Sequence, residues 1–452
     1  MAKKYLVYLA QSYPNFRKAE LESLAVLNNI KVDLSSHDES SPFMIVELEN
    51  DDEAFRWIDR SILSRGIYEL WGHGANLEEL HKNVQETSKQ YWDEYMGTSF
   101  KFDIISYQGG KRSRKQQIEL FETFSYLAFK GAIKMKSPDQ TFTILEKYHV
   151  IDRKPVEVAD YMWFGREVNL SARSKGALDK YLIPQRPYYG TTTFDSELAL
   201  ITCNLSLCGP GKFMYDPFTG TGAFLYAGAF FGSSVFGSDI DVRPLRGKNK
   251  DKTIKKNFEY YKTSTLFCDA VCMDFTNNAF RQDFLIDSIV CDPPYGVREG
   301  LKVCGTKRED RFETKKDLII EGEKAYLRRD FVQPKKPYEL DSLLDDLLKF
   351  SAEKLPIGGR LSFWMPTAND DFVPTIIPQH EDLELVYSLV QDFNKWARRL
   401  LVYVKRDDSY KGITLTKEQR TVANNFRDRY FTGFSPKTCQ NKDSKEGETF
   451  PQ

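Results

Sequence analysis

Apolar and polar residues follow two different periods in the first part of the chain. Short apolar runs at 4–10 and 43–49 predict β-strands, and apolar residues at helical spacing in 15–30 and 52–67 predict helices. The resulting order is strand, helix, strand, helix. This order predicts a ferredoxin-like domain over residues 1–70.

A second N-terminal unit is expected over residues 71–172. An apolar run at 99–107 predicts a strand, residues 117–130 have the spacing of an amphipathic helix, and two further strands are expected behind that helix. The basic turn GGKRSRKQQ, at 109–117, separates the first strand from the helix. Residues 173–194 follow as a linker of unusual composition.

Strands and helices alternate regularly over residues 195–434. Such alternation is typical of a parallel, doubly wound sheet. The predicted strands are KFMYDPF, SVFGSDI, STLFCDAV, DSIVCDPPY, GGRLSFWMP, LELVYSLVQDF and ARRLLVYVKR. The fold class is therefore α/β, a Rossmann-like seven-stranded domain preceded by an α+β N-terminal region. The polar tail, residues 435–452, is expected to be disordered.

Composition narrows the possible classes of protein. A chain of 452 residues is too long for one hydrophobic core, so two or three domains are expected. The net charge of −1 means that any nucleic-acid site must be a local basic patch. Seven cysteines without a CxxC pair and five scattered histidines argue against an internal metal site and for a reducing, cytoplasmic compartment. We find no signal peptide and no stretch that would span a membrane.

A glycine-rich turn follows the first strand of the predicted sheet. Gly220 and Gly222 allow the backbone conformations of a tight turn and the close approach of a ligand. Asp216, at the strand end, offers a carboxylate to a cationic amino group. The turn lacks the third glycine of a dinucleotide fingerprint and the GK[ST] of a phosphate loop, so it does not call for a pyrophosphate.

Two further acids are expected at equivalent places on the next strands. Asp239 is predicted to end the second strand, where a carboxylate accepts ribose hydroxyls, and Asp269 to end the third, where it accepts from an adenine amino group. Each acid alone is weak evidence, because Asp is common in turns. Three carboxylates in register without a phosphate cradle suit an ammonium, a sulfonium and an adenosine. S-adenosylmethionine has these three groups.

A proline-rich turn, DPPY, ends the fourth predicted strand. The carboxylate of Asp292 can accept one hydrogen of an exocyclic base amine, and the carbonyl of Pro293 can accept the other. Tyr295 offers a ring on which an extruded base stacks. The turn is therefore shaped to hold an amino group beside a methyl donor. In a purely structural interpretation, the two prolines only end a buried strand beside a capping acid.

With these motifs, the chain resembles the tRNA guanosine-10 N2-methyltransferase family, which comprises THUMP-containing enzymes of archaea and eukaryotes. The stretches that carry the resemblance are RPYYGTTTFDSELAL, YDPFTGTGAFLYAGA, GSDIDVRPLRGKN, CDPPYGVREGLKVCGTK and, closing the N-terminal part, FGREVNLSARS. The resemblance spans nearly the whole chain. It implies a THUMP-like RNA-binding domain at 71–172, a class I SAM-dependent methyltransferase domain at 195–434, and methylation of the N2 amino group of guanosine 10 in tRNA.

The resemblance also implies site residues and a partner. The catalytic motif would be Asp292, Pro293, Pro294 and Tyr295. The methyl donor would be bound by Asp216, Gly220, Gly222, Asp239, Ile240 and Asp269, with Arg186, Thr191 and Thr192 at its methionine end. Eukaryotic members of the family work as heterodimers with a small zinc-binding activator subunit. Because the third strand is predicted at the edge of the sheet, we expect the activator to add a strand there.

Basic segments offer contacts to RNA phosphates. The candidate residues are Lys111, Arg112, Arg114, Lys115, Arg298, Lys302, Lys307 and Arg308. The last four belong to a long insertion after DPPY, which we expect to order over the tRNA because it is attached to the catalytic turn. The alternative for each basic segment is an ordinary solvated face.

Two other functions remain open at this point. The same motif chemistry would serve an adenine-N6 or another guanine-N2 RNA methyltransferase. A non-catalytic RNA-binding scaffold is the alternative outside enzymes, although a scaffold has no need to keep Asp216, Gly220, Gly222 and Asp292 together.

Overall fold

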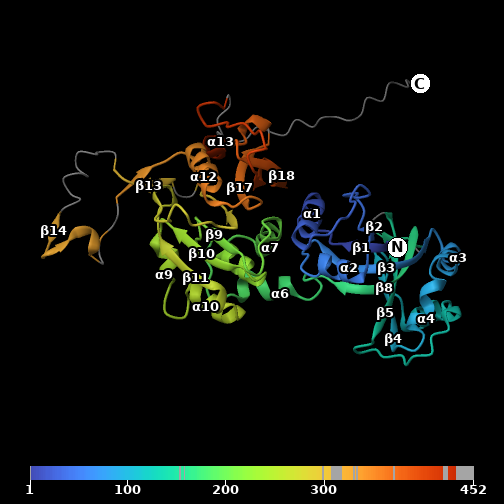
Figure 1. Cartoon of the computed structure of the whole chain (residues 1–452). Coiled ribbons are helices and arrows are strands. Elements are labelled where there is room, and N and C mark those ends of the chain that lie inside the picture. Colours follow the sequence, from blue (N-terminus) through green and yellow to red (C-terminus); the bar gives the residue numbers. More distant parts are fainter. Residues whose placement is uncertain are drawn as a thin grey trace, which may run out of the picture. The chain divides into compact units, whose positions relative to one another are not determined.

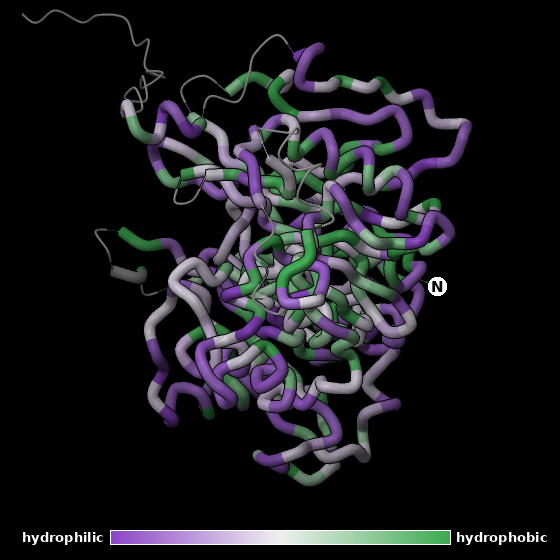
Figure 2. The backbone as a smooth tube through the Cα atoms, turned by 90° about the vertical axis from the view of Figure 1, so that its left-hand side faces the viewer, coloured by the Kyte–Doolittle hydropathy of each residue, from purple (hydrophilic) through white to green (hydrophobic). Residues whose placement is uncertain are grey.

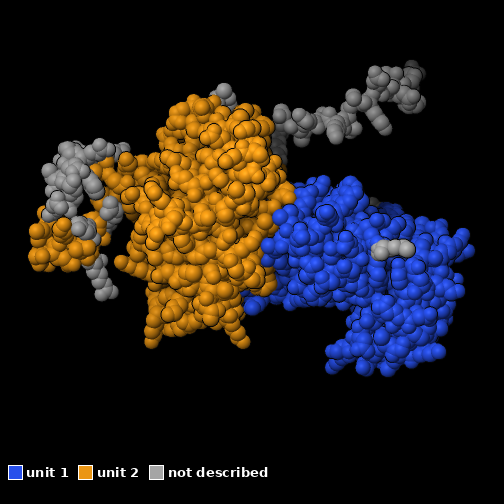
Figure 3. Space-filling view, viewed as in Figure 1, with its two compact units in different colours: residues 1–185 blue, residues 186–452 orange. Residues whose placement is uncertain are grey.

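The protein folds into two compact units, residues 1–185 and 186–452 (Figure 3). The computed structural model describes residues 2–151, 154–156, 158–297, 300–306, 318–328, 331, 334–369, 372–420 and 426–433 (Figure 1). Polar segments, purple in Figure 2, make up much of the outer loops. In this part of the chain no helix is long and apolar enough to cross a membrane.

The first unit is built on one six-stranded sheet in its described part, with the order β2-β1-β3-β8-β5-β4. The strands are β1 (Lys3–Leu9), β2 (Phe43–Leu48), β3 (Ser64–Gly74), β4 (Phe100–Tyr107), β5 (Gln140–Lys147) and β8 (Tyr161–Leu170). β4 and β5 are parallel, and the other neighbouring pairs are antiparallel. β3 runs through the domain limit predicted between residues 70 and 71, so both N-terminal parts share one sheet.

Helices flank this sheet and bury its apolar faces. They are α1 (Arg17–Asn28), α2 (Asp51–Ile58), α3 (Leu77–Thr87), α4 (Trp92–Tyr95), α5 (Arg114–Glu122) and α6 (Ala177–Tyr181). α2 begins where Asn50 accepts a hydrogen bond from the Glu53 amide at 3.0 Å, an N-cap. The helix predicted at 15–30 is confirmed as α1. The helix predicted at 52–67 is wrong beyond Ile58, because the chain enters β3 at Ser64.

The second unit contains a seven-stranded sheet in the order β11-β10-β9-β12-β17-β19-β18. The strands are β9 (Phe213–Asp216), β10 (Ser234–Asp239), β11 (Phe267–Cys272), β12 (Ser288–Cys291), β17 (Arg360–Ala368), β18 (Leu383–Asp392) and β19 (Trp396–Lys405). The first five strands are parallel, and β19 runs antiparallel between β17 and β18. All seven predicted strands are present. The third, β11, lies at the edge, as predicted.

The helices in the described residues of this unit are α7 (Ser196–Leu205), α8 (Ala223–Phe230), α9 (Val242–Arg246), α10 (Ile254–Tyr261), α12 (Leu340–Lys354) and α13 (Phe426–Thr432). Ile289 on β12 is fully buried with Leu347 of α12 and Leu361 of β17, so one core holds the middle of the sheet. β10 and β17 lie on opposite sides of the central pair β9 and β12. The loops after β9 and β12 therefore meet at the switch point of the sheet, where ligands bind in open α/β folds.

The insertion after DPPY contributes short strands. β13 (Lys302–Cys304) pairs with β16 (Lys335–Pro337), and β14 (Ile319–Ile320) pairs with β15 (Glu323–Lys324). The predicted disordered tail, 435–452, lies outside the described residues.

Candidate active site

Asp216 ends β9 at the switch point with its side chain almost fully buried. One carboxylate oxygen, Oδ1, accepts from the Phe218 amide at 2.9 Å. The other, Oδ2, is buried and has no hydrogen-bond partner among the described residues. Burial, followed by the charges of Asp239 and Asp292, raises the pKa of Asp216 well above its usual range. A buried acceptor without a donor is costly, so this oxygen suits a cationic ligand group.

The glycine turn after β9 has the backbone conformation that its sequence predicts. Gly220 and Gly222 have φ angles of 50° and 91°, in the left-handed region that favours glycine. A Cβ on Gly222 would lie 2.8 Å from Tyr226 Oη, so the turn has no room for a side chain there. The Gly220 amide donates to Asp239 Oδ2 at 2.8 Å and ties the turn to the end of β10.

Asp239 is the last residue of β10. Besides the bond from Gly220, its Oδ1 accepts from the Asp241 amide at 2.8 Å. Burial raises the pKa of Asp239, against the effect of these two amides. Each oxygen keeps a second lone pair, so the carboxylate can still accept from ribose hydroxyls. The carbonyl of the next residue, Ile240, accepts from Lys335 Nζ at 2.6 Å.

The prediction that Asp269 ends the third strand is wrong. Residues 264–266 form a 3₁₀ turn, so β11 starts at Phe267 and Asp269 lies inside it, exposed. Its Oδ1 accepts from the Ala270 amide at 2.8 Å. The acid that follows β11 is Asp274, which is nearly buried and accepts from the Thr276 amide at 3.0 Å and from the Cys304 amide at 2.6 Å. Asp274 is the residue that sequence reasoning missed, because the strand was placed too early.

Arg186 is buried behind the glycine turn. Its Nε donates to Tyr261 Oη at 2.8 Å, its Nη2 donates to Ser196 Oγ at 2.9 Å, and its guanidinium lies 5.2 Å from the ring centroid of Tyr226. Tyr226 in turn donates to the Thr221 carbonyl at 2.7 Å. Arg186 thus supports the turn through an aromatic ring.

The threonine run before α7 contacts the turn through its third member. Thr191 and Thr192 are exposed, whereas Thr193 Oγ1 lies 2.9 Å from Thr221 Oγ1. The same oxygen accepts from the Gly190 amide at 2.8 Å. The sequence alone gave no signal to choose among three adjacent threonines.

The DPPY turn follows β12, the direct neighbour of β9. Tyr295 Oη donates to Asp292 Oδ1, and the Tyr295 ring meets Phe426 edge-on at 6.3 Å between centroids. Desolvation raises the pKa of Asp292 to about 6, although the bond from Tyr295 and the charge of Arg398 act in the opposite direction. Pro293 is buried and Pro294 is exposed.

Arg398, on β19, lies among aromatic rings near this turn. Its guanidinium lies 4.7 Å from the ring centroid of Phe194 and 5.3 Å from that of Trp364, and it donates to Gln391 Oε1 at 2.6 Å. Its positive charge lowers the pKa values of both Asp292 and Tyr295, against the effect of burial. Sequence reasoning missed Arg398 because it lies about a hundred residues after the motif on which its charge acts.

Comparisons with known proteins identify the family of this chain. Residues 3–173 match the model of the Tmrp11 THUMP N-terminal domain, and residues 184–307 match the RMKL-like methyltransferase domain. The tRNA (guanine(10)-N(2))-methyltransferase of Saccharomyces cerevisiae is 52% identical over 437 residues, which cover 96% of this chain and 100% of that protein. The chain belongs to the tRNA guanosine-10 N2-methyltransferase family.

Two further comparisons cover most of this chain at lower identity. The tRNA (guanine(10)-N(2))-methyltransferase of Schizosaccharomyces pombe is 34% identical over 470 residues, covering 95% of this chain and 96% of that protein. The solved structure of TrmN from Thermus thermophilus aligns with a TM-score of 0.42 at 16% identity, covering 89% of this chain and 99% of that chain.

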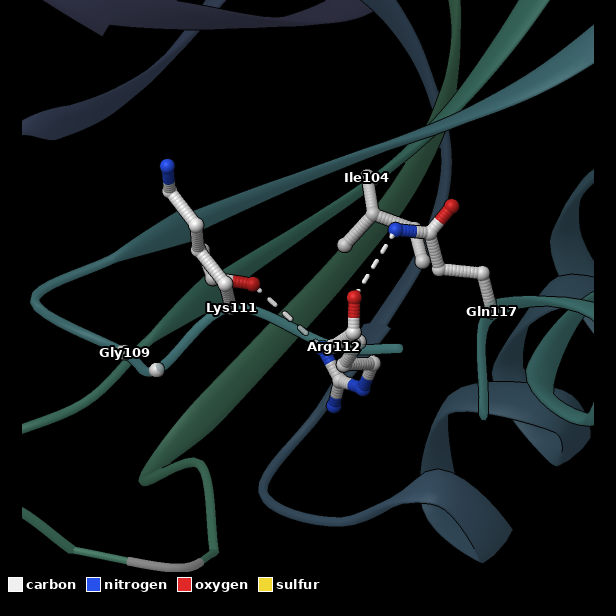
Figure 4. Close-up of a pocket in the computed structure, with 7 residues that line it drawn as sticks. Ile104, Gly109, Lys111, Arg112 and Gln117 are labelled. Carbon is white, nitrogen blue, oxygen red and sulfur yellow. Dashed lines mark hydrogen bonds between the residues drawn. The ribbon is translucent and has the colours of Figure 1, made fainter. Parts of the chain in front are cut away.

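The first unit of this family member carries the basic turn. The Arg112 guanidinium already has partners within the protein. It pairs with the buried carboxylate of Glu146 and donates to Tyr148 Oη at 2.9 Å. Lys111, Arg114 and Lys115 are exposed. A hollow beside this turn has a volume of about 270 Å³, and Arg112 and Gln117 are among the residues that line it. Figure 4 shows the Lys111 side chain pointing away from Ile104. Of the insertion candidates, Lys302 is exposed on β13. Arg298, Lys307 and Arg308 lie outside the described residues.

Proposed function

We propose that this chain is the catalytic subunit of a tRNA methyltransferase that transfers a methyl group from S-adenosylmethionine to the exocyclic N2 of guanosine 10. The observation that carries the proposal is the unpartnered Oδ2 of buried Asp216 beside the DPPY turn. The names of the relatives, which cover nearly the whole chain, support the base and its position.

The residues present fit the proposed donor. Asp216 Oδ2 takes its ammonium group. A Cβ at Gly220 would meet no atom nearer than the Phe218 carbonyl oxygen at 4.0 Å, so the donor can approach the backbone of the turn there. Asp239 accepts from its ribose hydroxyls, and Asp274 takes the adenine amino group in place of the exposed Asp269. When bound, the donor supplies an electrophilic methyl carbon to the guanine amine.

The catalytic turn acts on the amine. The Asp292 carboxylate and the Pro293 carbonyl accept its two hydrogens, which directs the nitrogen lone pair, while the Tyr295 ring stacks on the extruded base. The amine becomes acidic only after methylation, so no strong base is needed first. A carboxylate with a pKa of about 6 then suffices to take the released proton. Alignment and fixed dipoles, rather than base strength, supply most of the acceleration.

The test uses the full chain with S-adenosylmethionine and unmodified tRNA, followed by mapping of the product nucleoside. We expect N2-methylguanosine at position 10 alone. Asp292→Ala should abolish turnover while donor binding survives. Methyladenosine, a guanosine methylated elsewhere, or no product in the presence of the activator would each contradict the proposal.

We also propose a small zinc-binding activator as partner, in a cytoplasmic heterodimer. β11 supports this proposal because it is the edge strand, with Cys268, Asp269 and Cys272 exposed. An unpaired edge offers backbone donors and acceptors to an added strand.

A further inference from the structure

Aromatic rings form a continuous chain from the catalytic tyrosine to the surface of the second unit. Tyr295 contacts Phe426, which contacts Trp396 at 5.3 Å and Tyr430 at 5.9 Å between ring centroids. Trp396 stacks on Phe393 at 4.5 Å, and Tyr430 contacts Phe431 at 5.7 Å. We call this set the aromatic array: Tyr295, Phe393, Trp396, Phe426, Tyr430 and Phe431.

Exposure increases along the array with distance from its centre. Phe426 is 2% exposed, whereas Phe393 is 39%, Tyr430 is 45% and Phe431 is 65% exposed. A contiguous set of exposed rings anchored on a buried one is costly in water and is typical of a binding surface.

Three cations accompany these rings in space or in sequence. A Cβ at Gly296 would lie 3.4 Å from Cδ of Arg427, so the Arg427 side chain runs beside the catalytic turn. Lys395 is exposed between Phe393 and Trp396 in sequence, and the Arg398 guanidinium lies 5.3 Å from the Phe393 ring centroid.

The acids nearby offset only part of this charge. Asp392 remains negatively charged although its Oδ1 accepts from the Asn394 amide at 2.8 Å and from Asn369 Nδ2 at 2.9 Å, because both donors are neutral. Asp428, on α13, is exposed. Rings interleaved with a net excess of cations suit a nucleic-acid strand, because bases stack on rings and phosphates pair with cations.

The array lies at the ligand-binding edge of the sheet. Trp396 pairs in register with Ala368, the last residue of β17, so the turn between β18 and β19 stands beyond the carboxyl end of β17. β17 is the parallel neighbour of β12, whose carboxyl end carries DPPY. A strand of RNA that delivers a base to Tyr295 therefore passes this turn and α13.

We infer that the aromatic array binds the nucleotides that flank the extruded base, with flanking bases stacked on Tyr430 and Phe431 and phosphates facing Lys395 and Arg427. The inference rests on the proposed function, and it adds a surface that sets affinity for the RNA rather than the rate of methyl transfer.

The experiment compares the full chain with the double variant Tyr430→Ala/Phe431→Ala. The matched control is Tyr260→Ala, since Tyr260 is a tyrosine of the same unit that is 46% exposed and lies on α10, outside the array. Steady-state kinetics on unmodified tRNA are measured together with donor affinity by calorimetry and tRNA affinity by fluorescence anisotropy.

We expect KM and Kd for tRNA to rise at least about tenfold in the double variant, with kcat and donor affinity unchanged. Tyr430→Phe should retain wild-type affinity, because it keeps the ring. Unchanged tRNA affinity in the double variant overturns the inference, as does loss of activator binding with tRNA affinity intact, which would identify a protein as the occupant.

The two measurements distinguish a failure of the proposed function from a failure of the aromatic array to bind RNA. If the wild-type chain does not methylate guanosine, the anisotropy measurement still decides whether the array binds RNA. If it methylates guanosine while the double variant binds tRNA normally, only the array is refuted.

Discussion

At the scale of single residues, the site depends on which acid stands at each strand end. Asp269 and Asp274 lie five positions apart in one segment, yet one is exposed inside the edge strand and the other is nearly buried after it. Asp274 also holds the Cys304 amide at the start of the insertion. A carboxylate that joins the donor site to the insertion is therefore better placed to receive adenine than one on the outer edge.

Replacing these two acids one at a time tests that assignment. Asp274→Asn should weaken S-adenosylmethionine binding by about tenfold or more, because it removes a charge-assisted hydrogen bond. Asp269→Asn, the control, should leave donor affinity unchanged. Calorimetric titration with the donor provides the measurement, and equal losses in both variants would contradict the assignment.

A second residue-scale prediction concerns the pH dependence of the chemical step. Tyr295, Arg398, Asp216 and the Cys291 thiol are the titratable or charged groups that act on Asp292 or are acted on by it. The Arg398 cation stabilises the Asp292 carboxylate. Removing the cation therefore raises the pKa of Asp292 above its value of about 6.

Single-turnover rates should rise with pH as Asp292 ionises, which gives the pH–rate profile an acidic limb. Arg398→Met should move this limb to higher pH, and the rate of the variant should recover at pH values above it. Arg399→Met is the control, because Arg399 neighbours Arg398 on β19 but stacks on Phe372 and donates to Thr367 Oγ1 at 3.2 Å. An acidic limb that stays in place in Arg398→Met would show that the arginine does not act through Asp292.

At the scale of elements, one backbone amide of the edge strand β11 is hydrogen-bonded to a side chain of the same strand. The Ala270 amide bonds to the Asp269 carboxylate of its own strand at 2.8 Å, so this N–H belongs to the open edge rather than to the ladder with β10. An exposed acid that occupies an edge donor protects the edge against unwanted pairing.

Ala270→Pro should therefore spare the sheet and damage the proposed activator interface. Proline removes the edge donor and adds ring atoms where a partner strand would approach. We expect activator affinity to fall at least about tenfold in a pull-down titration, with donor affinity and the melting temperature of the isolated chain retained. Normal complex formation would exclude strand addition at this position.

The strands of the second sheet could be predicted from the sequence, whereas contacts between distant residues could not. Apolar runs that end in turn residues identified all strands of the second sheet, because buried strands need unbroken apolar segments. The start of β11 was misplaced because Ser264–Leu266 lead into the strand without a glycine or proline to mark its start, yet they fold as a 3₁₀ turn. The roles of Thr193 and Arg398 depend on partners far away in sequence, and no local pattern reveals such pairs.

At the scale of the whole molecule, a chain with a net charge of −1 must bind a polyanion through local patches. The first unit offers the exposed cations of the basic turn, and the second offers the aromatic array and the catalytic turn. Phosphate contacts position a substrate without reading its sequence, whereas we propose that the DPPY turn selects the amine. The first unit is thus expected to contribute to affinity alone, whereas the second contributes to both affinity and chemistry.

That separation predicts the behaviour of the triple variant Lys111→Ala/Arg114→Ala/Lys115→Ala. Lys115 is bound only loosely to Glu119, at 3.8 Å with both side chains exposed, so all three cations are available to phosphates. We expect weaker tRNA binding. The slope of log K for tRNA association against log[salt] should become shallower by about 2, because each of the three lost phosphate contacts contributes roughly 0.7 to it.

The control is Lys31→Ala/Lys82→Ala/Lys89→Ala, which removes the same charge from exposed positions of the same unit outside the turn. Because the methyl-transfer residues all lie in the second unit, kcat at saturating tRNA should equal that of the wild type. Equal salt slopes in the two triple variants would mean that the basic turn contacts no phosphate.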